Sequence, residues 1–103
     1  MIAVSDAFVA LPGGLGTLDE LFEVLTLRQI GEHAKPVGLL DQHGYWQPLL
    51  KFMDEQVIAQ RFLNPEHRDL WLRVAAPEDV LPGIASAPRW GEDARGLAAV
   101  RAG

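Results

Sequence analysis

The apolar residues of this chain fall into segments that alternate between strand-like and helix-like patterns. Predominantly apolar runs at residues 7–11, 36–40 and 70–75 predict three strands. The run at residues 36–40 is continuous, which is typical of a strand buried on both faces. Between them, apolar residues recur at helical spacing, which predicts two crossover helices. The alternation predicts an α/β fold with a parallel sheet, organised as a β-α-β-α-β-α unit.

Glycine and proline residues predict where the helices begin and end. Gly31 is expected to stop the first helix, and the second is expected to begin between Gly44 and Pro48 and to extend to about Arg61. One apolar stripe on this second helix is expected to pack on the sheet: Trp46, Leu49, Leu50, Met53 and Val57.

The last part of the chain predicts one more short helix and then a tail. After a turn at residues 64–65 and the third strand, Pro77 opens a helix whose first acidic residues face its dipole. Pro82 and Gly83 are expected to end this helix early. From Pro88 onward no periodic face remains, and residues 88–103 are expected to be a loose tail.

The first helix, from Thr17 to Gln29, is apolar on two nearly opposite sides. One side carries Leu18, Leu21, Phe22 and Leu25, and the other carries Val24, Leu27 and Ile30. A helix that is apolar on two sides is covered on two sides, and a short chain has few helices to spare. We therefore expect a homodimer contact through this helix, since twofold pairing is the commonest subunit arrangement.

Length and composition narrow the class of protein. The chain has 103 residues, of which 49% are hydrophobic and 22% charged, a composition typical of a globular domain. The formal charge of −5 argues against a nucleic-acid partner, and the absence of cysteine excludes disulfides and cysteine-ligated metals. No signal segment begins the chain and no apolar run approaches a membrane span, so a cytoplasmic location without membrane contact is expected.

Residues 12–20, with the sequence PGGLGTLDE, follow the first apolar run and open the first helix. Such a turn leaves backbone N–H groups unpaired at a helix start, where the helix dipole favours an anion. Glycine has no Cβ, which would block both a tight turn and the approach of a ligand to the backbone. The turn contains three glycines: Gly13, Gly14 and Gly16. The turn therefore predicts a phosphorylated small molecule. It is not a Walker A loop, and Asp19 occupies the third glycine position of a dinucleotide fingerprint.

Thr17 and Glu20 allow a purely structural interpretation of the same turn. Their spacing is that of a capping box, in which a hydroxyl and a carboxylate satisfy backbone N–H groups reciprocally at a helix start. A cap alone does not explain three glycines and a proline in front of it.

Residues 12–20 also match the PGGxGTxxE signature of the LONELY GUY (LOG) family, and the chain resembles this family as far as about Asp79. The resemblance implies a Rossmann-like, three-layer nucleotide-binding fold over residues 1–87. It implies hydrolysis of the N-glycosidic bond of a nucleoside 5′-monophosphate, a cytokinin riboside monophosphate or AMP. Glu20 matches the family's catalytic carboxylate, and the 5′-phosphate is expected on the backbone and hydroxyl groups of Gly13, Gly14, Gly16 and Thr17. No cofactor is expected.

The resemblance has one departure. Family members carry further strand–helix units and an Arg-Lys pair upstream of the position matched by Met1, so the chain is expected to be the C-terminal half of a family member. The alternative is a non-catalytic nucleotide-binding or dimerisation module. The family's older label, lysine decarboxylase, gains no support, because neither Lys35 nor Lys51 has the setting of a Schiff-base lysine.

The remaining chemical candidates have structural interpretations. Asp19 is expected only to favour the helix dipole, and Asp41, at the end of the second strand, is expected to be a solvated loop acid. The histidines lack the spacing of metal ligands, so no metal site is expected, and His33 is given a structural or interface role. Helix surfaces or loops are expected for Arg28, Arg61, Arg68 and Arg73.

Overall fold

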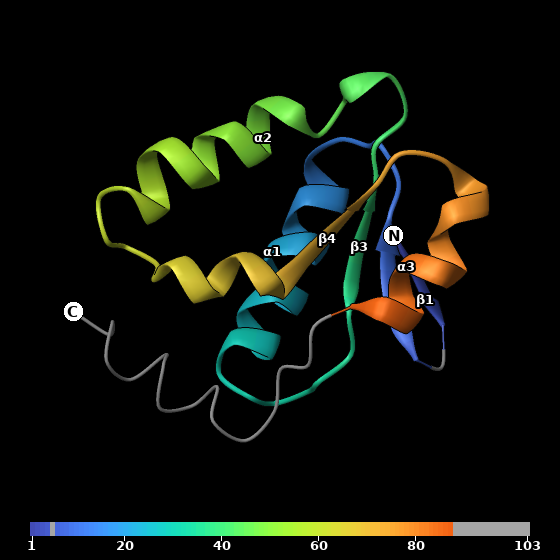
Figure 1. Ribbon diagram of the computed structural model, residues 1–103, viewed down its shortest axis with the longest axis horizontal. Coiled ribbons are helices and arrows are strands. Elements are labelled where there is room, and N and C mark those ends of the chain that lie inside the picture. The colour runs from blue at the N-terminus through green and yellow to red at the C-terminus, as the bar shows by residue number, and fades with distance from the viewer. Residues whose placement is uncertain (5, 88–103) are drawn as a thin grey trace.

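A four-stranded sheet with helices on both sides organises the computed structural model, which describes residues 1–4 and 6–87 (Figure 1). In spatial order the strands are β1 (Ile2–Val4), β2 (Ala7–Ala10), β3 (Val37–Leu40) and β4 (Trp71–Val74). The three predicted strands are confirmed as β2, β3 and β4, which run parallel. The prediction of a purely parallel sheet is wrong, because β1 pairs antiparallel with β2. A three-residue strand is too short to show a pattern of its own.

Helix α1 (Leu15–Gln29) begins two residues before the predicted start at Thr17 and ends where it was predicted to end. Beyond it, Gly31 has a φ of 83°, in the left-handed region that favours glycine. The N–H of Gly31 donates to the carbonyl of Arg28 at 3.1 Å, and the N–H of Glu32 donates to that of Leu27 at 2.9 Å. This is the Schellman arrangement, so the predicted role of Gly31 as the helix stop is confirmed.

The second helix is made of α2 (Gln47–Phe52) and a π-helical continuation, η2 (Met53–Ile58). It ends before the predicted Arg61, whose own φ of 68° lies outside the helical region. Short 3-10 helices flank it, η1 (Gln42–Gly44) before it and η3 (Pro65–Leu70) after it. At the start of its apolar stripe Trp46 is buried in the core, as predicted.

The last helix, α3 (Val80–Ser86), follows the 3-10 turn η4 (Pro77–Asp79). The prediction that Pro82 and Gly83 end this helix is wrong. Pro82 lies in the first turn of α3, where the missing N–H of proline is tolerated. A Cβ on Gly83 would lie 3.1 Å from Leu72 Cδ2, so this glycine lets α3 pack closely on β4. The predicted tail at residues 88–103 lies outside the described residues.

The main core lies between the sheet and the layer formed by α1 and α2. Strand residues that alternate toward this layer meet the buried Leu21 of α1, and the core cluster consists of Ala10, Leu21, Val37, Leu39 and Trp46. Leu18, Leu25 and also Val24 pack against this core, whereas Phe22 and Ile30 remain 43% and 38% exposed. Helix α3 covers the opposite face of β3 and β4, so helices form a layer on each side of the sheet (Figure 1).

The environment predicted for Arg28 is wrong. It was expected on a helix surface, but it is 1% exposed, and its Nη1 lies 3.4 Å from the carbonyl oxygen of Leu70. Burial lowers the pKa of Arg28, while the nearby charge of Asp69 acts in the opposite direction. This arginine therefore belongs to the packing of α1 on η3. No helix in the described part of the chain is long and apolar enough to cross a membrane.

Candidate active site

The glycine-rich turn joins β2 to α1 at the carboxyl edge of the parallel strands. Gly14 is the N-cap residue of α1, and the N–H of Leu18 donates to its carbonyl oxygen at 3.1 Å. Within the described residues no side chain caps this end of α1, and Thr17 and Glu20 both lie inside the helix, so the capping-box interpretation is wrong. The first N–H groups of a helix have no intrahelical acceptor, which leaves those at Leu15, Gly16 and Thr17 available to a ligand.

The three glycines of this turn have different surroundings. A Cβ added to Gly14 or Gly16 would meet nothing within 4 Å, so the space beside both residues is open. A Cβ added to Gly13 would lie 2.3 Å from Thr17 Oγ1, well inside van der Waals contact. Gly13 is therefore required by the packing of the turn itself, whereas Gly14 and Gly16 leave room above the helix start.

Tyr45 is a residue of the site that the sequence interpretation missed. Its hydroxyl donates a hydrogen bond to the carbonyl oxygen of Gly13, although 32 residues separate them. Tyr45 lies in the segment between β3 and α2, and its ring packs edge-on against Trp46 with centroids 5.1 Å apart. The spacing of the motif gives no indication of this contact, because it depends on the pairing of β2 with β3.

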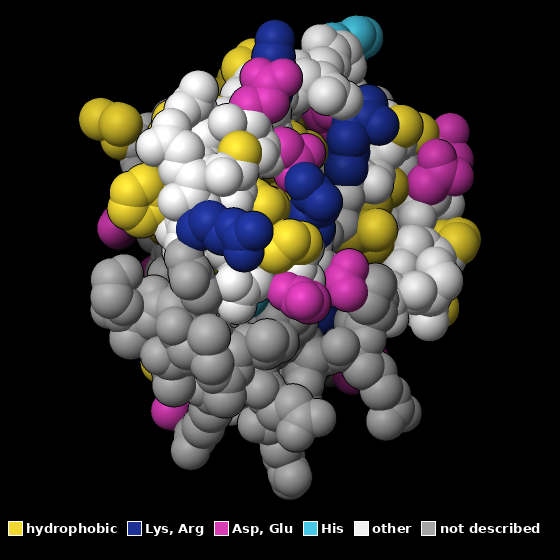
Figure 2. Space-filling view, turned by 60° about the vertical axis from the view of Figure 1, so that its left-hand side comes forward, with side chains coloured by type: hydrophobic (Ala, Val, Ile, Leu, Met, Phe, Trp, Pro, Cys, Tyr) yellow, Lys and Arg dark blue, Asp and Glu magenta, His cyan; other side chains and the backbone are white. Residues whose placement is uncertain are grey.

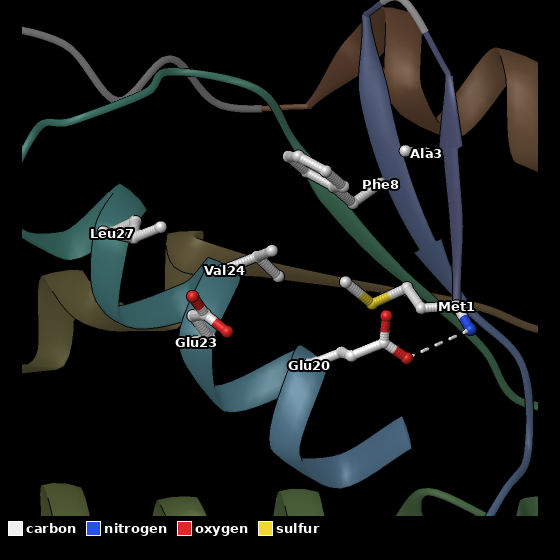
Figure 3. A pocket seen from close by; sticks show the side chains of 7 residues that line it. All are labelled: Met1, Ala3, Phe8, Glu20, Glu23, Val24 and Leu27. Atoms are coloured by element: carbon white, nitrogen blue, oxygen red, sulfur yellow. Dashed lines mark ion pairs between the residues drawn. The ribbon is translucent and has the colours of Figure 1, made fainter. Parts of the chain in front are cut away.

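Glu20 lies in the second turn of α1, with its side chain 60% exposed. It lines a pocket of about 250 Å³ between α1 and the first two strands, and its Oε1 lies 3.9 Å from the amino nitrogen of Met1 (Figure 3). The rest of the lining is mostly apolar: Met1, Ala3, Phe8, Glu23, Val24 and Leu27. None of the four phosphate-binding candidates lines this pocket. The carboxylate and the turn therefore lie on consecutive turns of one helix, and the turn does not line this pocket.

Asp41 is a second residue whose predicted environment is wrong. It was expected in solvent, but it is 2% exposed and accepts three hydrogen bonds. The donors are the N–H of Trp46 at 2.7 Å, Nε2 of Gln47 at 3.1 Å and Nε of Arg73 at 2.5 Å. Arg73 was expected on a helix surface or in a loop, yet it lies on β4 and forms an ion pair with this carboxylate.

The environment of Asp41 acts on its pKa in two directions. Burial alone raises the pKa of a carboxyl group, but the hydrogen bonds from Trp46 and Arg73 and the charge of Arg73 outweigh burial. The net effect is a pKa below the ordinary value of 3.8, so Asp41 is charged at neutral pH.

Hydrogen bonds within the fold hold His33 and His67. Lys35 N–H donates to His33 Nδ1 at 3.1 Å, so the other ring nitrogen donates to the carbonyl of Val24 at 2.8 Å. This agrees with the structural role predicted for His33. His67 is buried and accepts a hydrogen bond from the N–H of Asn64 at the start of η3. Lys35 and Lys51 are both exposed.

Charged side chains of both signs are interspersed on the face of the molecule drawn in Figure 2. Lys and Arg side chains lie next to Asp and Glu side chains there, with apolar side chains between them. One exposed pair joins Arg68 Nε to Asp54 Oδ1 at 2.7 Å. Side chains of both signs therefore occur together on the described part of this face.

The fold and the turn together define an α/β protein with an open, glycine-rich strand-to-helix turn at the carboxyl edge of parallel strands. Such an edge is where α/β proteins commonly bind their ligands. A family model described as "Possible lysine decarboxylase" matches residues 1–84, and the chain belongs to this family, the LOG family. The membership of the LOG family that the sequence predicted is thereby confirmed.

Curated relatives share substantial identity with the chain. It is 57% identical over 74 residues to the probable cytokinin riboside 5′-monophosphate phosphoribohydrolase LOGL9 of Oryza sativa subsp. japonica, covering 72% of this chain and 31% of that protein. It is 45% identical over 105 residues to the cytokinin riboside 5′-monophosphate phosphoribohydrolase LOG1 of Arabidopsis thaliana, covering 90% of this chain and 48% of that protein. The chain thus spans less than half the length of these relatives.

Proposed function

We propose that this chain carries the phosphate-binding turn and the catalytic carboxylate of a nucleoside-5′-monophosphate phosphoribohydrolase. The reaction adds water across the N-glycosidic bond of a cytokinin riboside 5′-monophosphate or AMP and yields the free base and ribose 5-phosphate. The observation that carries the proposal is the uncapped start of α1 with open space beside Gly14 and Gly16. The names of the relatives supply the class of substrate.

The turn is suited to hold the 5′-phosphate. The N–H groups at Leu15, Gly16 and Thr17 stand at the positive end of the helix dipole, and the Thr17 hydroxyl adds a donor on the same turn. Glycine at positions 14 and 16 allows a phosphate oxygen to approach the backbone, because no Cβ stands in the way.

Glu20 is suited to the chemical step. As the bond between ribose and base breaks, positive charge develops on the ribose ring, and a nearby carboxylate stabilises that charge or activates the attacking water. Glu20 follows the phosphate-binding residues by one turn of α1, so a ribose extending along the helix from its 5′-phosphate would approach this carboxylate.

The fold and the surface support two further parts of the proposal. The β2-α1-β3-α2-β4 order with helices on both sides is compatible with part of a Rossmann-like domain. Phe22, exposed on α1, and Ile30, exposed at its C-cap, are compatible with a homodimer contact through this helix. A cytoplasmic location completes the proposal.

A chimera tests the catalytic assignment. In it, this chain replaces the matching segment of the Arabidopsis relative, and release of free base from isopentenyladenosine 5′-monophosphate and AMP is measured. We expect turnover, and we expect Glu20→Gln to lower kcat/KM by about 10²- to 10⁴-fold, the usual contribution of such a carboxylate. Glu23→Gln is the matched control, because Glu23 lines the same pocket. Equal activity of the two variants would remove Glu20 from the mechanism.

A second candidate function is nucleotide binding without catalysis. It is favoured by the separation of the two candidate groups, since none of the four phosphate-binding candidates lines the pocket that Glu20 lines. Titration of the 103-residue chain with AMP separates the two functions. Binding without release of adenine supports the second, and release of adenine by the chain alone supports the first.

A further inference from the structure

Two turns meet at the carboxyl edge of the sheet, and only one of them belongs to the family motif. β2 leads into the glycine-rich turn, and β3 leads into residues 41–47. The two strands are parallel neighbours, with Ala10 beside Leu39. We propose that Asp41, held by Arg73, is a positioning residue for the phosphate-binding turn, acting through Tyr45. This inference rests on the proposed function and assigns a supporting role to residues outside the motif.

Asp41 fixes both ends of its own turn. Its backbone N–H donates to the carbonyl of Val74 on β4 at 2.7 Å, which holds the start of the turn on the sheet. Its carboxylate accepts from the N–H of Trp46 and from Gln47 Nε2, which holds the start of α2. Arg73 Nε, on the neighbouring strand, binds the same carboxylate from the side. The carboxylate is thus the point at which β3, β4 and α2 are joined.

The backbone between these anchors adopts an unfavourable conformation. His43 has a φ of 60° and Gly44 a φ of 73°, so two consecutive residues are left-handed and the first is not glycine. Such a conformation persists only where the surrounding structure imposes it, and conformations of this kind cluster at functional sites. Asp41 and Trp46, on either side of it, supply that constraint.

The constrained turn, residues 41–47, places Tyr45 in contact with the phosphate-binding turn. Tyr45 is 48% exposed, so burial alone does not fix its position. Its ring packs edge-on against the buried Trp46, and its hydroxyl donates to the carbonyl of Gly13. The carbonyl of Gly13 and the N–H of Gly14 belong to one planar peptide group, so holding the carbonyl fixes the direction of that N–H. Tyr45 thereby orients a backbone donor at the helix start.

The test compares three variants of the 103-residue chain. Tyr45→Phe removes only the hydroxyl, and Arg73→Gln removes the charge that holds Asp41. Arg68→Gln is the matched control, because Arg68 forms a similar pair with Asp54 on the surface. In the ligand-free ¹⁵N spectrum we expect the Gly14 amide to move in Tyr45→Phe and in Arg73→Gln and to stay in place in Arg68→Gln. A Gly14 amide unmoved in both of the first two variants would overturn the proposal.

Titration with ribose 5-phosphate gives the second readout. We expect Tyr45→Phe and Arg73→Gln each to raise Kd by about 3- to 10-fold, the worth of one hydrogen bond, with Arg68→Gln unchanged. The double variant should be no weaker than the weaker single variant, because both changes act through one chain of contacts. Additive losses would contradict this. Failure of the unmodified chain to bind ribose 5-phosphate counts against the proposed function, while the Gly14 amide still decides the positioning role.

Discussion

The two turns at the carboxyl edge of the sheet are built in opposite ways. The turn after β2 is open: in the described part of the chain no side chain caps α1, and no atom lies within 4 Å of a Cβ added at Gly14 or Gly16. The turn after β3 is closed around Asp41, a residue that is 2% exposed and whose carboxylate accepts three hydrogen bonds within the protein. The two turns therefore have different roles. Donors left unsatisfied can serve a ligand, and an internally satisfied neighbour keeps them in place.

The largest expected effect comes from removing the anchor of the closed turn. Asp41→Ala leaves the Arg73 guanidinium and the Trp46 N–H without their acceptor, so we expect a loss of about 2–4 kcal/mol in the free energy of unfolding. Asp54→Ala removes the acid of the exposed pair with Arg68 and should cost less than about 1 kcal/mol. Denaturant unfolding of both variants measures the difference. Equal losses would mean that burial of Asp41 adds nothing.

The same carboxylate makes stability depend on pH. The pKa of Asp41 is lowered in the folded state, below the ordinary 3.8, so its contribution is fully present above that value. The contribution is lost as the pH falls below 3.8 and through the lower folded pKa, because the unfolded chain binds the proton more readily. Thermal unfolding between pH 7 and pH 2 should show a fall in Tm on the acid side. The fall should be smaller in Asp41→Asn.

A smaller effect is expected from adding a side chain at Gly13 in the open turn. Gly13→Ala places a Cβ 2.3 Å from Thr17 Oγ1, and the stiff β-branched side chain of Thr17 cannot move without shifting the helix start. We expect a loss of about 1–3 kcal/mol in stability and weaker binding of AMP. Chemical denaturation and calorimetric titration measure the two quantities. A variant that keeps both would show that the turn adapts to a side chain here.

The smallest effect has the opposite sign on stability. Gly16 lies in the first turn of α1 with no atom near its would-be Cβ, so Gly16→Ala should stabilise the chain by about 0.5–1 kcal/mol through helix propensity. The added methyl group occupies the space proposed for phosphate, so AMP binding should weaken in the same variant. Unchanged binding would indicate that the ligand does not approach the backbone at this residue.

The sequence was informative wherever local chemistry decides the structure. The apolar runs of β2 and β3, the stop at Gly31 and the turn around Gly14 depend on neighbouring residues, and all could be predicted. Burial of Asp41 and Arg28 could not, because their partners Arg73 and Leu70 are 32 and 42 residues away. The contact of Tyr45 could not be predicted for the same reason, because Tyr45 follows β3 and its acceptor, the carbonyl of Gly13, lies in the turn after β2.

The backbone amides at the start of α1 give the most direct test of the proposed phosphate site. In a ¹⁵N-labelled sample of the chain, titration with AMP should move the amides of Leu15, Gly16 and Thr17, together with that of Gly14 beside them, more than any others. Adenosine, which lacks the phosphate, should leave them in place. If AMP and adenosine gave the same shifts, or if AMP left these three amides unmoved, the turn would not be a phosphate site and the central claim would be wrong.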